Sequence, residues 1–600
     1  MKIFKRIFAF ILLLLTIFTT SSCGTVKRDP SEFDDFSRQV LELVVGDSEM
    51  AINFLFKNPE AYGIPRGNAY LYQPSESNSA VGMFLINFIL GQIDGFDYNE
   101  LSFDQQMTYH IIKDLTADIN NIIQDESYMG RSYLGSYLGY QAQLPIQLLN
   151  YNLRDKQDLD NYFIYIDEVD NTFQAYYNFE VRSADKGYGM PDFVIDKVVG
   201  QCQGFLTNIE SESHFMIKTM NDRIDKLTFL TDAEKEYYKQ LNRDKVRGPM
   251  ADGYRYVMEN LPSLKGRATN NMGLAHYKDA KGNEIGKQYY EKVFQEAVGY
   301  NVSVNDALVY IEEKLIQSNE RIDAVRIYYQ EHPEELEKIK NIEFMEGGIE
   351  EQLEYYQEII KGYYPEVNTN FNLEILYVDE ALQEYYSPAA YFLSAIDDRK
   401  SEKIVLNPGE IYIYGTNELD KEYLSTALAH EGFPGHMYQH IYFKTSEANL
   451  LRKVLRDSGY QEGWANYSET FTYEYYFDKH PEFSEYALEY YLAQVDFQAA
   501  FYTKLDIGIH YLGWTLEETG AYIKEYLDVD DDAIKRVYEQ LIEVPGNYPT
   551  YFYTYLKIID LRNYALSKGG SVLEFNTLML DCGPIGLEHV EEYIRSYYEK

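Results

Sequence analysis

Most of the chain carries apolar residues three or four positions apart, the spacing that places them on one face of an α-helix. Thr231 and Ser303 stand just ahead of two such stretches, where a hydroxyl can cap the first backbone N–H groups. Loops with glycine and proline, such as 62–67 and 186–191, separate the stretches. The clearest predicted helices cover residues 36–51, 102–123, 159–179, 232–241, 287–297, 303–318 and 333–362.

The pattern changes at about residue 370. Residues 373–378 predict a short strand, and the runs 403–407 and 410–414, split by Pro408-Gly409, predict a β-hairpin. Helical patterns then return at 446–457 and elsewhere. We therefore predict a mainly α-helical fold with a small β-sheet, whose edge strand can pair with an extended peptide.

The two parts of the mature chain differ in their predicted secondary structure. Residues 36–369 form a helical N-terminal part, and residues 370–600 form the part that holds the candidate chemistry. No fixed-period repeat or flexible linker separates them. We expect one continuous superstructure.

The chain begins with a secretion signal. Two lysines and an arginine precede the apolar run 7–18, and small residues at 19–22 lead to Cys23. The apolar run is short for a transmembrane helix. A Cys in this position resembles a bacterial lipobox, which makes residues 1–22 a signal peptide, Cys23 the lipidated first residue and 23–35 a tether. The alternative is a plain secreted protein cut nearby.

The predicted lipid anchor indicates the compartment of the protein, and the net charge limits the kinds of partner it can bind. The protein is expected outside the cytoplasm, held to the membrane through lipid only, on the outer face of the cytoplasmic membrane or facing the periplasm. A formal charge of −42 argues against nucleic acid as a partner, because a phosphate backbone would be repelled. The sequence does not determine the oligomeric state.

The remaining cysteines, Cys202 and Cys582, are too few for a disulfide framework or a Cys-rich metal site. A bond between them is possible, but two buried thiols are the preferred interpretation. The sixty tyrosines are interpreted as packing residues at half-buried positions.

Three of the ten histidines lie within residues 429–440, at His430, His436 and His440. A His-Glu pair followed by another His is typical of a catalytic zinc site: neutral imidazoles bind the metal, and Glu431 acts as general base on the bound water.

The spacing of these histidines leaves two ligand pairs open. On an unbroken helix, residues six apart such as His430 and His436 point about 240° apart and cannot share a metal. Pro434-Gly435 can interrupt the helix and bring them together. Alternatively His436 and His440, four apart, form the pair on a following helix.

A catalytic zinc needs a third protein ligand and an open fourth position. Glu462, near the start of a predicted helix that runs toward Phe477, is the best candidate. Glu469 lies two turns further on the same face and can orient a ligand from behind. The helix that ends at His430 is predicted to begin near residue 418, with Asn417 as its cap.

His-Glu-x-x-Pro-Gly-His at 430–436, followed by Glu-Gly-Trp-Ala-x-Tyr-x-Glu at 462–469, resembles a bacterial family known as domain of unknown function 885. That family is grouped with the gluzincins, zinc peptidases whose third ligand is a glutamate. The resemblance covers most of the mature chain, with weaker similarity at 139–145, 187–191 and 545–551.

The resemblance implies zinc ligands His430, His436 and Glu462, with Glu431 as the base, in a gluzincin-like helical fold with a central cleft. The chain departs from the family pattern at Met437 and Asn576, where many members carry His.

Two further residues are candidates near the end of the chain. Tyr551 matches the family's Tyr after Pro545-Gly546, and its phenol could donate to the oxyanion; the alternative is that it packs. Arg562 could bind a substrate carboxylate through two hydrogen bonds. The alternative is that it pairs with a carboxylate of the protein itself. His440 is expected to lie on the surface or behind the ligands.

The predicted function is hydrolysis of peptide bonds in short peptides by one zinc ion per chain, with Glu431 taking a proton from the metal-activated water. Two alternatives come from other classes. One is a lipoprotein that binds peptides or other solutes without catalysis, and the other is a metallohydrolase of non-peptide amides or esters. The sequence does not specify side-chain preference or which end of a peptide is cut.

Overall fold

A computed structural model describes residues 27–599, except for 75, 123–127, 268–271, 341, 379–382, 384–386 and 412–419. The predicted signal peptide and the lipid-carrying Cys23 lie outside the described residues. None of the helices in the described part is both long enough and apolar enough to cross a membrane.

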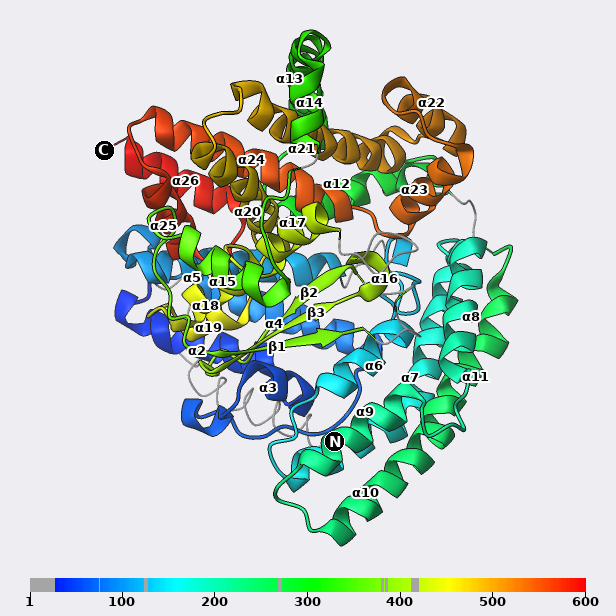
Figure 1. The fold of residues 1–600 in the computed structure, drawn as a ribbon. Helices are drawn as coiled ribbons and strands as arrows, with labels where there is room; N and C mark the ends of the chain where they lie inside the picture. The colour runs from blue at the N-terminus through cyan, green and yellow to red at the C-terminus, as the bar shows by residue number, and fades with distance from the viewer. Residues whose placement is uncertain are drawn as a thin grey trace.

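The first part of the chain is helical (Figure 1). Its α-helices are α2 (Phe33–Val45), α3 (Glu49–Leu55), α4 (Glu76–Ile93), α5 (Phe103–Ile122), α6 (Tyr140–Asn150), α7 (Lys156–Asp185), α8 (Asp192–Leu206), α9 (Phe215–Lys226), α10 (Asp232–Lys245), α11 (Ala251–Asn260), α12 (Ile285–Val298), α13 (Val304–Glu331), α14 (Pro333–Ile339) and α15 (Ile349–Ile359).

Three strands follow α15, and helices make up the remainder. These elements are β1 (Asn372–Tyr377), β2 (Ala389–Phe392), β3 (Ser401–Leu406), α16 (Pro408–Ile411), α17 (Lys421–Glu431), α18 (His436–Thr445), α19 (Leu450–Val454), α20 (Ser458–Lys479), α21 (Glu485–Ile507), α22 (Leu516–Tyr526), α23 (Asp531–Glu543), α24 (Asn547–Ser567), α25 (Val572–Cys582) and α26 (Leu587–Tyr598).

The expected mainly helical fold with a small sheet is confirmed, and most of the helices predicted in the first part of the chain are present. Residues 102–123, 159–179, 232–241, 287–297 and 303–318 correspond to α5, α7, α10, α12 and α13 within the part that is described. Both predicted caps are present as well. The Thr231 hydroxyl accepts from the backbone of Glu234, and that of Ser303 accepts from the backbone of Asp306.

Two predicted long helices are each divided into two shorter ones. The predicted helix 36–51 is wrong as one element, because Gly46, with φ of 59°, ends α2, and Ser48 caps a new helix. The predicted helix 333–362 is also divided, with Gly347 at φ of 92° ahead of α15. Apolar spacing continued across both turns, so it did not reveal them.

The helices nearest the motif also begin later than expected. Asp420 caps α17 by accepting from the backbone N–H of Tyr423 at 3.1 Å, while the predicted cap Asn417 lies outside the described residues. Of the predicted helix 446–457, only α19 forms, because Asn449 caps it at the Leu451 N–H.

The sheet has strand order β1-β3-β2, with β1 parallel and β2 antiparallel to β3, so β2 is an edge strand. The predicted strand 373–378 is confirmed as β1, but the hairpin across Pro408-Gly409 is wrong. The Asn407 side chain accepts from the Gly409 N–H at 3.0 Å and caps α16 there, with Pro408 in its first turn.

Buried apolar side chains form two large clusters. One lies among α6 to α11, at the lower right of Figure 1. The other joins α12, α13 and α15 with the sheet, with α17, α18 and with α20 to α26. Cys202 is buried in the first and Cys582 in the second, and both are free thiols, as preferred from the sequence.

The helix that carries Glu462 packs very closely against its neighbours. A Cβ atom added to Gly463 of α20 would lie 2.6 Å from Thr554 Oγ1 of α24, and one added to Gly459 would lie 2.7 Å from the Ala297 carbonyl oxygen. Glycine therefore sets how deeply the start of α20 sits in the core.

Replacing Gly463 by Ala should lower the free energy of unfolding by about 1–3 kcal/mol, because the new methyl group overlaps Thr554 in a packed interface. Denaturant unfolding of chelator-treated protein would measure this change.

The matched control is Gly200→Ala in the middle of α8, where an added Cβ meets no atom within 4 Å. This substitution should stabilise the protein by about 0.5–1 kcal/mol through helix propensity alone. Equal stability of the two variants would contradict the close packing of α20 on α24.

Candidate metal and peptide site

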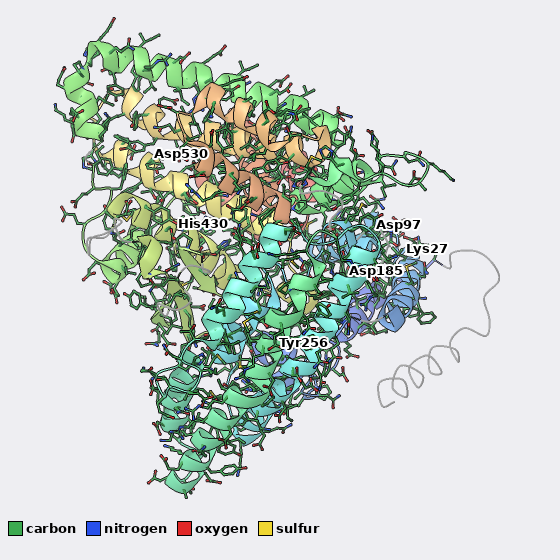
Figure 2. All side chains as sticks on the ribbon, turned by 90° about the vertical axis from the view of Figure 1, so that its right-hand side faces the viewer. Lys27, Asp97, Asp185, Tyr256, His430 and Asp530 are labelled. Atoms are coloured by element: carbon green, nitrogen blue, oxygen red, sulfur yellow. The ribbon has the colours of Figure 1, made fainter. Side chains whose placement is uncertain are left out.

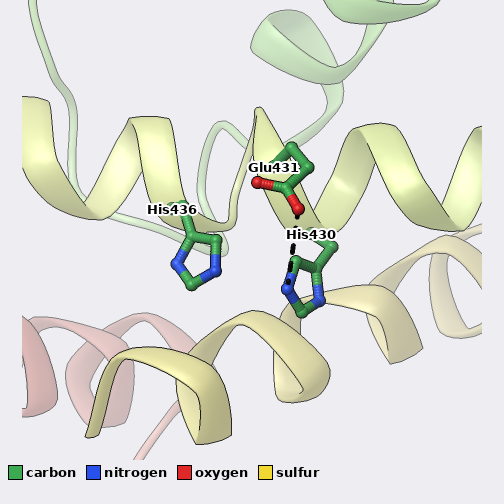
Figure 3. Close-up of side chains that lie close together, drawn as sticks. All are labelled: His430, Glu431 and His436. Carbon is green, nitrogen blue, oxygen red and sulfur yellow. Dashed lines mark ion pairs between the residues drawn. The ribbon is translucent and has the colours of Figure 1, made fainter. Parts of the chain in front are cut away.

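The chain between α17 and α18 makes the interruption that the His430–His436 spacing requires. α17 ends at Glu431, a cis Phe433-Pro434 bond follows, and α18 begins at His436. The Gly435 N–H donates to the Ala429 carbonyl at 2.8 Å, which folds the chain back on the end of α17. The two imidazole rings then lie 4.8 Å apart between centroids (Figure 3).

Gly432 and Gly435 in this turn have no room for a side chain. A Cβ at Gly435 would lie 1.8 Å from the His430 carbonyl oxygen, and one at Gly432 would lie 2.5 Å from Leu353 Cδ2. No other residue type fits at either position without moving backbone or core.

α20 supplies the remaining carboxylates. Glu462 Oε2 lies 3.5 Å from His430 Nε2 and 3.3 Å from His436 Nε2. One and a half to two turns further along, Glu469 Oε1 lies 2.7 Å from His430 Nδ1. A proton on Nδ1, donated to that carboxylate, would leave the Nε2 electron pair for a metal ion.

α20 also holds the turn itself. Trp464 Nε1 donates to the Pro434 carbonyl at 2.9 Å, and the Ser468 hydroxyl donates to the same oxygen at 3.3 Å. The stretch 462–469 thus places two carboxylates at His430 and anchors the loop that carries His436.

Three of these atoms, the two Nε2 nitrogens and Glu462 Oε2, form a donor set that fits zinc. Tetrahedral ligands at 2.0–2.1 Å from a metal are separated from one another by about 3.3 Å. Glu462 Oε2 is buried and receives no hydrogen bond from the residues that the structure describes. A buried carboxylate oxygen in that state is suited to bind a cation.

The charges around the set favour the ionised form of Glu462. Burial by itself raises the pKa of Glu462, but the His436 and His430 imidazoles lower it far below the usual value. Burial lowers the pKa of His430, whereas Glu462, Glu469 and Glu431 raise it, and the net direction is upward. A metal ion at this position would replace the proton that these carboxylates attract.

Glu431 lies beside the donor set. Its Oε1 is 4.0 Å from His430 Nε2, the contact drawn in Figure 3, and its Oε2 accepts from the Tyr391 N–H at 2.6 Å. Tyr391 lies on the edge strand β2, and its N–H is directed to Glu431 and not into the pairing with β3. The carboxylate is therefore oriented by the edge of the sheet.

A cavity of about 490 Å³ opens over these groups. Its lining comes from β2, α17, α18, α20, α23, α24 and the loop before α6, and includes Tyr137, Pro388, Ala389, Ala390, Tyr391, Tyr423, His430, Glu431, His436, Gln461, Glu462, Glu469, Gln540, Asn547, Tyr548 and Tyr551. The sheet lies beside the candidate site, as expected.

Tyr551 enters the cavity from the first turn of α24. Asn466 of α20 donates to its carbonyl at 3.0 Å, which ties the two helices together at the site. Burial, together with the charges of Glu462 and Glu431, raises the pKa of Tyr551 well above its usual value. The phenol therefore stays protonated and can donate a hydrogen bond.

Two predicted site residues lie elsewhere. His440 Nε2 bonds to the Ser394 carbonyl at 2.9 Å and does not line the cavity, so the His436–His440 pair is not the one that the fold assembles. Arg562 binds Glu474 through two hydrogen bonds of 2.6 and 2.9 Å. Arg562 therefore has the internal carboxylate partner that the sequence offered as the alternative to a substrate.

Several lining residues were not identified from the sequence. Tyr137, Tyr423 and Tyr548 were lost among sixty tyrosines, although the similarity at 139–145 begins two residues after Tyr137. Ala389 and Ala390 carry no functional side chain, and only their place on the edge strand brings them to the site.

The sequence matches the family described as "Bacterial protein of unknown function (DUF885)" over residues 60–594, and the chain belongs to that family. No curated protein matches it.

Solved structures of similar fold include a candidate lipoprotein from Colwellia psychrerythraea, with 16% identity, a TM-score of 0.78 and coverage of 95% of this chain and 100% of that one. A candidate lipoprotein of unknown function from Shewanella oneidensis has 16% identity, a TM-score of 0.64 and coverage of 94% and 100%. A candidate oligoendopeptidase F from Bacillus anthracis str. Ames has a TM-score of only 0.31, at 12% identity over 88% and 93%, which is too weak for argument.

Proposed function

We propose that the protein is a zinc-dependent peptide hydrolase of gluzincin type, with His430, His436 and Glu462 as the metal ligands. The observation that carries this proposal is the donor set itself. Two imidazole nitrogens lie 3.3 and 3.5 Å from a buried carboxylate oxygen that has no hydrogen-bond donor among the described residues.

Zinc in such a set supplies an acidified water and polarises a carbonyl group. Glu431, held by the Tyr391 N–H, takes the proton of the attacking water and returns it to the leaving amine. Tyr551 keeps its phenolic proton and donates to the carbonyl oxygen as negative charge develops there. Glu469 keeps the His430 ring in the correct tautomer.

The edge strand favours peptides over other amides. β2 pairs with β3 on one side, and its other side faces the cavity through Ala389, Ala390 and Tyr391. An extended peptide backbone can continue the sheet along this edge and pass over Glu431. Neither non-peptide amides nor esters use such an edge.

The proposed location is outside the cytoplasm, with lipid on Cys23. The amino-terminal pattern described above supports this placement, and both structures of similar fold are described as candidate lipoproteins. The substrates are then short peptides in that compartment.

Zinc content would test the ligand set in a soluble chain that lacks residues 1–23. We expect one zinc per chain in the unsubstituted protein and its loss in His430→Ala, His436→Ala and Glu462→Ala, measured by elemental analysis after dialysis. Glu469→Gln should keep zinc with an affinity weaker by about 10- to 100-fold.

His440→Ala is the matched control, since this histidine lies on the same helix as His436 but bonds to Ser394. It should retain zinc. Zinc that survives loss of His436 but not of His440 would contradict the ligand set, and a protein that never takes up zinc would point to a binding lipoprotein instead.

Glu431→Gln should keep zinc and lower kcat for a cleaved peptide by about 100- to 10,000-fold, because the amide cannot accept the proton of water. Steady-state kinetics on a panel of short peptides, with non-peptide amides and esters in parallel, would measure this. A near-normal rate in Glu431→Gln would exclude it as the base.

Tyr551→Phe should lower kcat by about 100- to 1,000-fold and leave zinc content unchanged, because only a donor to the developing oxyanion is removed. Tyr423→Phe, at another phenol of the same cavity, serves as the comparison. Equal effects of the two substitutions would argue against a special role for Tyr551.

A further inference from the structure

One wall of the cavity comes from a distant part of the chain. Tyr137 lies in the loop before α6 and lines the cavity beside Tyr548 and Tyr551 of α24. Its side chain is 40% exposed, and its hydroxyl has no hydrogen-bond partner among the residues that the structure describes. A phenol that is open to the cavity in this way is available to a ligand.

The loop that carries Tyr137 is clamped by one carboxylate. Glu543, at the end of α23 and 407 positions from Ser136, accepts from the Ser136 N–H and from the Ser136 hydroxyl at 2.5 Å. It also accepts from the Tyr137 N–H at 3.0 Å. Three donors on one carboxylate fix the backbone of this loop.

The other side of the loop is held from the helices of the first part of the chain. Gln201 of α8 donates to the Ser136 carbonyl at 2.7 Å, and Gln141 of α6 donates to the Gly135 carbonyl at 2.7 Å. A Cβ added to Gly135 would lie 3.1 Å from Glu543 Oε1, so the loop approaches the carboxylate closely. These contacts leave the Tyr137 backbone little freedom.

Glu543 and the cavity residues of α24 belong to one continuous segment of the chain. Glu543 is followed by the turn at Gly546, whose N–H donates to buried Asp506, and then by α24 with Tyr548 and Tyr551. Because Glu543 holds the Tyr137 loop and lies only a few residues before Tyr551, the loop is fixed relative to Tyr551. Such rigidity is what a ligand contact needs.

We propose that Tyr137 is a substrate-binding residue of this cavity, whose phenol donates a hydrogen bond to a backbone carbonyl of the bound peptide, and that Glu543 is the positioning residue that holds it. This inference rests on the proposed peptide hydrolysis. Burial and the charge of Glu462 raise the pKa of Tyr137, which keeps the donor proton in place at neutral pH.

The first measurement compares Tyr137→Phe with the unsubstituted protein on the best-cleaved member of a panel of short neutral peptides. We expect KM to rise about tenfold with kcat within about twofold, because a contact made equally before and during reaction is lost. Zinc content and melting temperature should be unchanged. An unaltered KM would overturn the proposal.

Glu543 is tested by loss and by rescue. Glu543→Ala should raise KM as Tyr137→Phe does, and the double variant should be no worse than either single one, because both remove the same contact. Glu543→Gln should be close to normal, since its amide oxygen can accept both N–H groups and its NH₂ can donate to Ser136. Multiplicative effects in the double variant would overturn the clamp.

Glu539→Ala is the matched control on the same helix. Glu539 pairs with Lys197 at 3.5 Å and with Lys535 at 3.7 Å, and neither of these ion pairs involves the Tyr137 loop. Its KM should be unchanged. A KM rise equal to that of Glu543→Ala would mean that any disturbance of α23 has this effect, and would overturn the specific role of Glu543.

A binding measurement separates this inference from the proposed function. In a Glu431→Gln background, the panel peptide that binds most tightly should lose about tenfold in affinity when Tyr137 is replaced by Phe, measured by calorimetry. If no peptide is cleaved by the normal protein but this loss is seen, the hydrolase proposal fails and the role of Tyr137 stands. If affinity is unaffected, or no peptide binds, the role of Tyr137 is overturned.

Discussion

The Pro434 carbonyl is the point on which the candidate site depends. The turn between α17 and α18 brings two histidines that are six positions apart in the sequence close together. The turn itself has no regular helical hydrogen bonding. Trp464 and Ser468 donate to that single oxygen from α20, the same helix that presents Glu462 and Glu469. One helix thus fixes both the loop and the carboxylates, so the relative positions of the ligands do not depend on more distant elements.

The sequence allowed the donor set to be predicted because its determinants are local. His430, His436 and Glu462 stand in two short stretches whose residue types are typical of a metal site, although the spacing left two histidine pairs open and only the resemblance to the family implied this set. Long amphipathic helices were predictable for the same reason. The break at Gly46 was not, because a turn shorter than one helical period leaves the apolar spacing almost unchanged. The connection at 340–348 was not either, because its own apolar residues continue the pattern.

Features that depend on contacts between distant segments could not be predicted. The Asn407 cap starts α16 where the second strand of a hairpin was predicted, and the neighbours of β3 in the described residues are β1 and β2. Placing the edge of β2 over Glu431 needs the three-dimensional fold, and so does placing Tyr137 in the cavity. Arg562 shows the opposite case: its chemistry suited a substrate, but Glu474 lies close enough to satisfy it.

The Glu543 clamp has a consequence for the order of assembly. Tyr133 and Leu134, just before the Tyr137 loop, belong to the apolar cluster of α6 to α11, whereas Leu541 and Ile542, just before Glu543, belong to the cluster around the donor set. The last wall of the cavity therefore closes only after both clusters have formed and docked. A chain in which only the cluster around the donor set had formed would hold its histidines and Glu462 on elements of one cluster, yet would still lack a complete binding cavity.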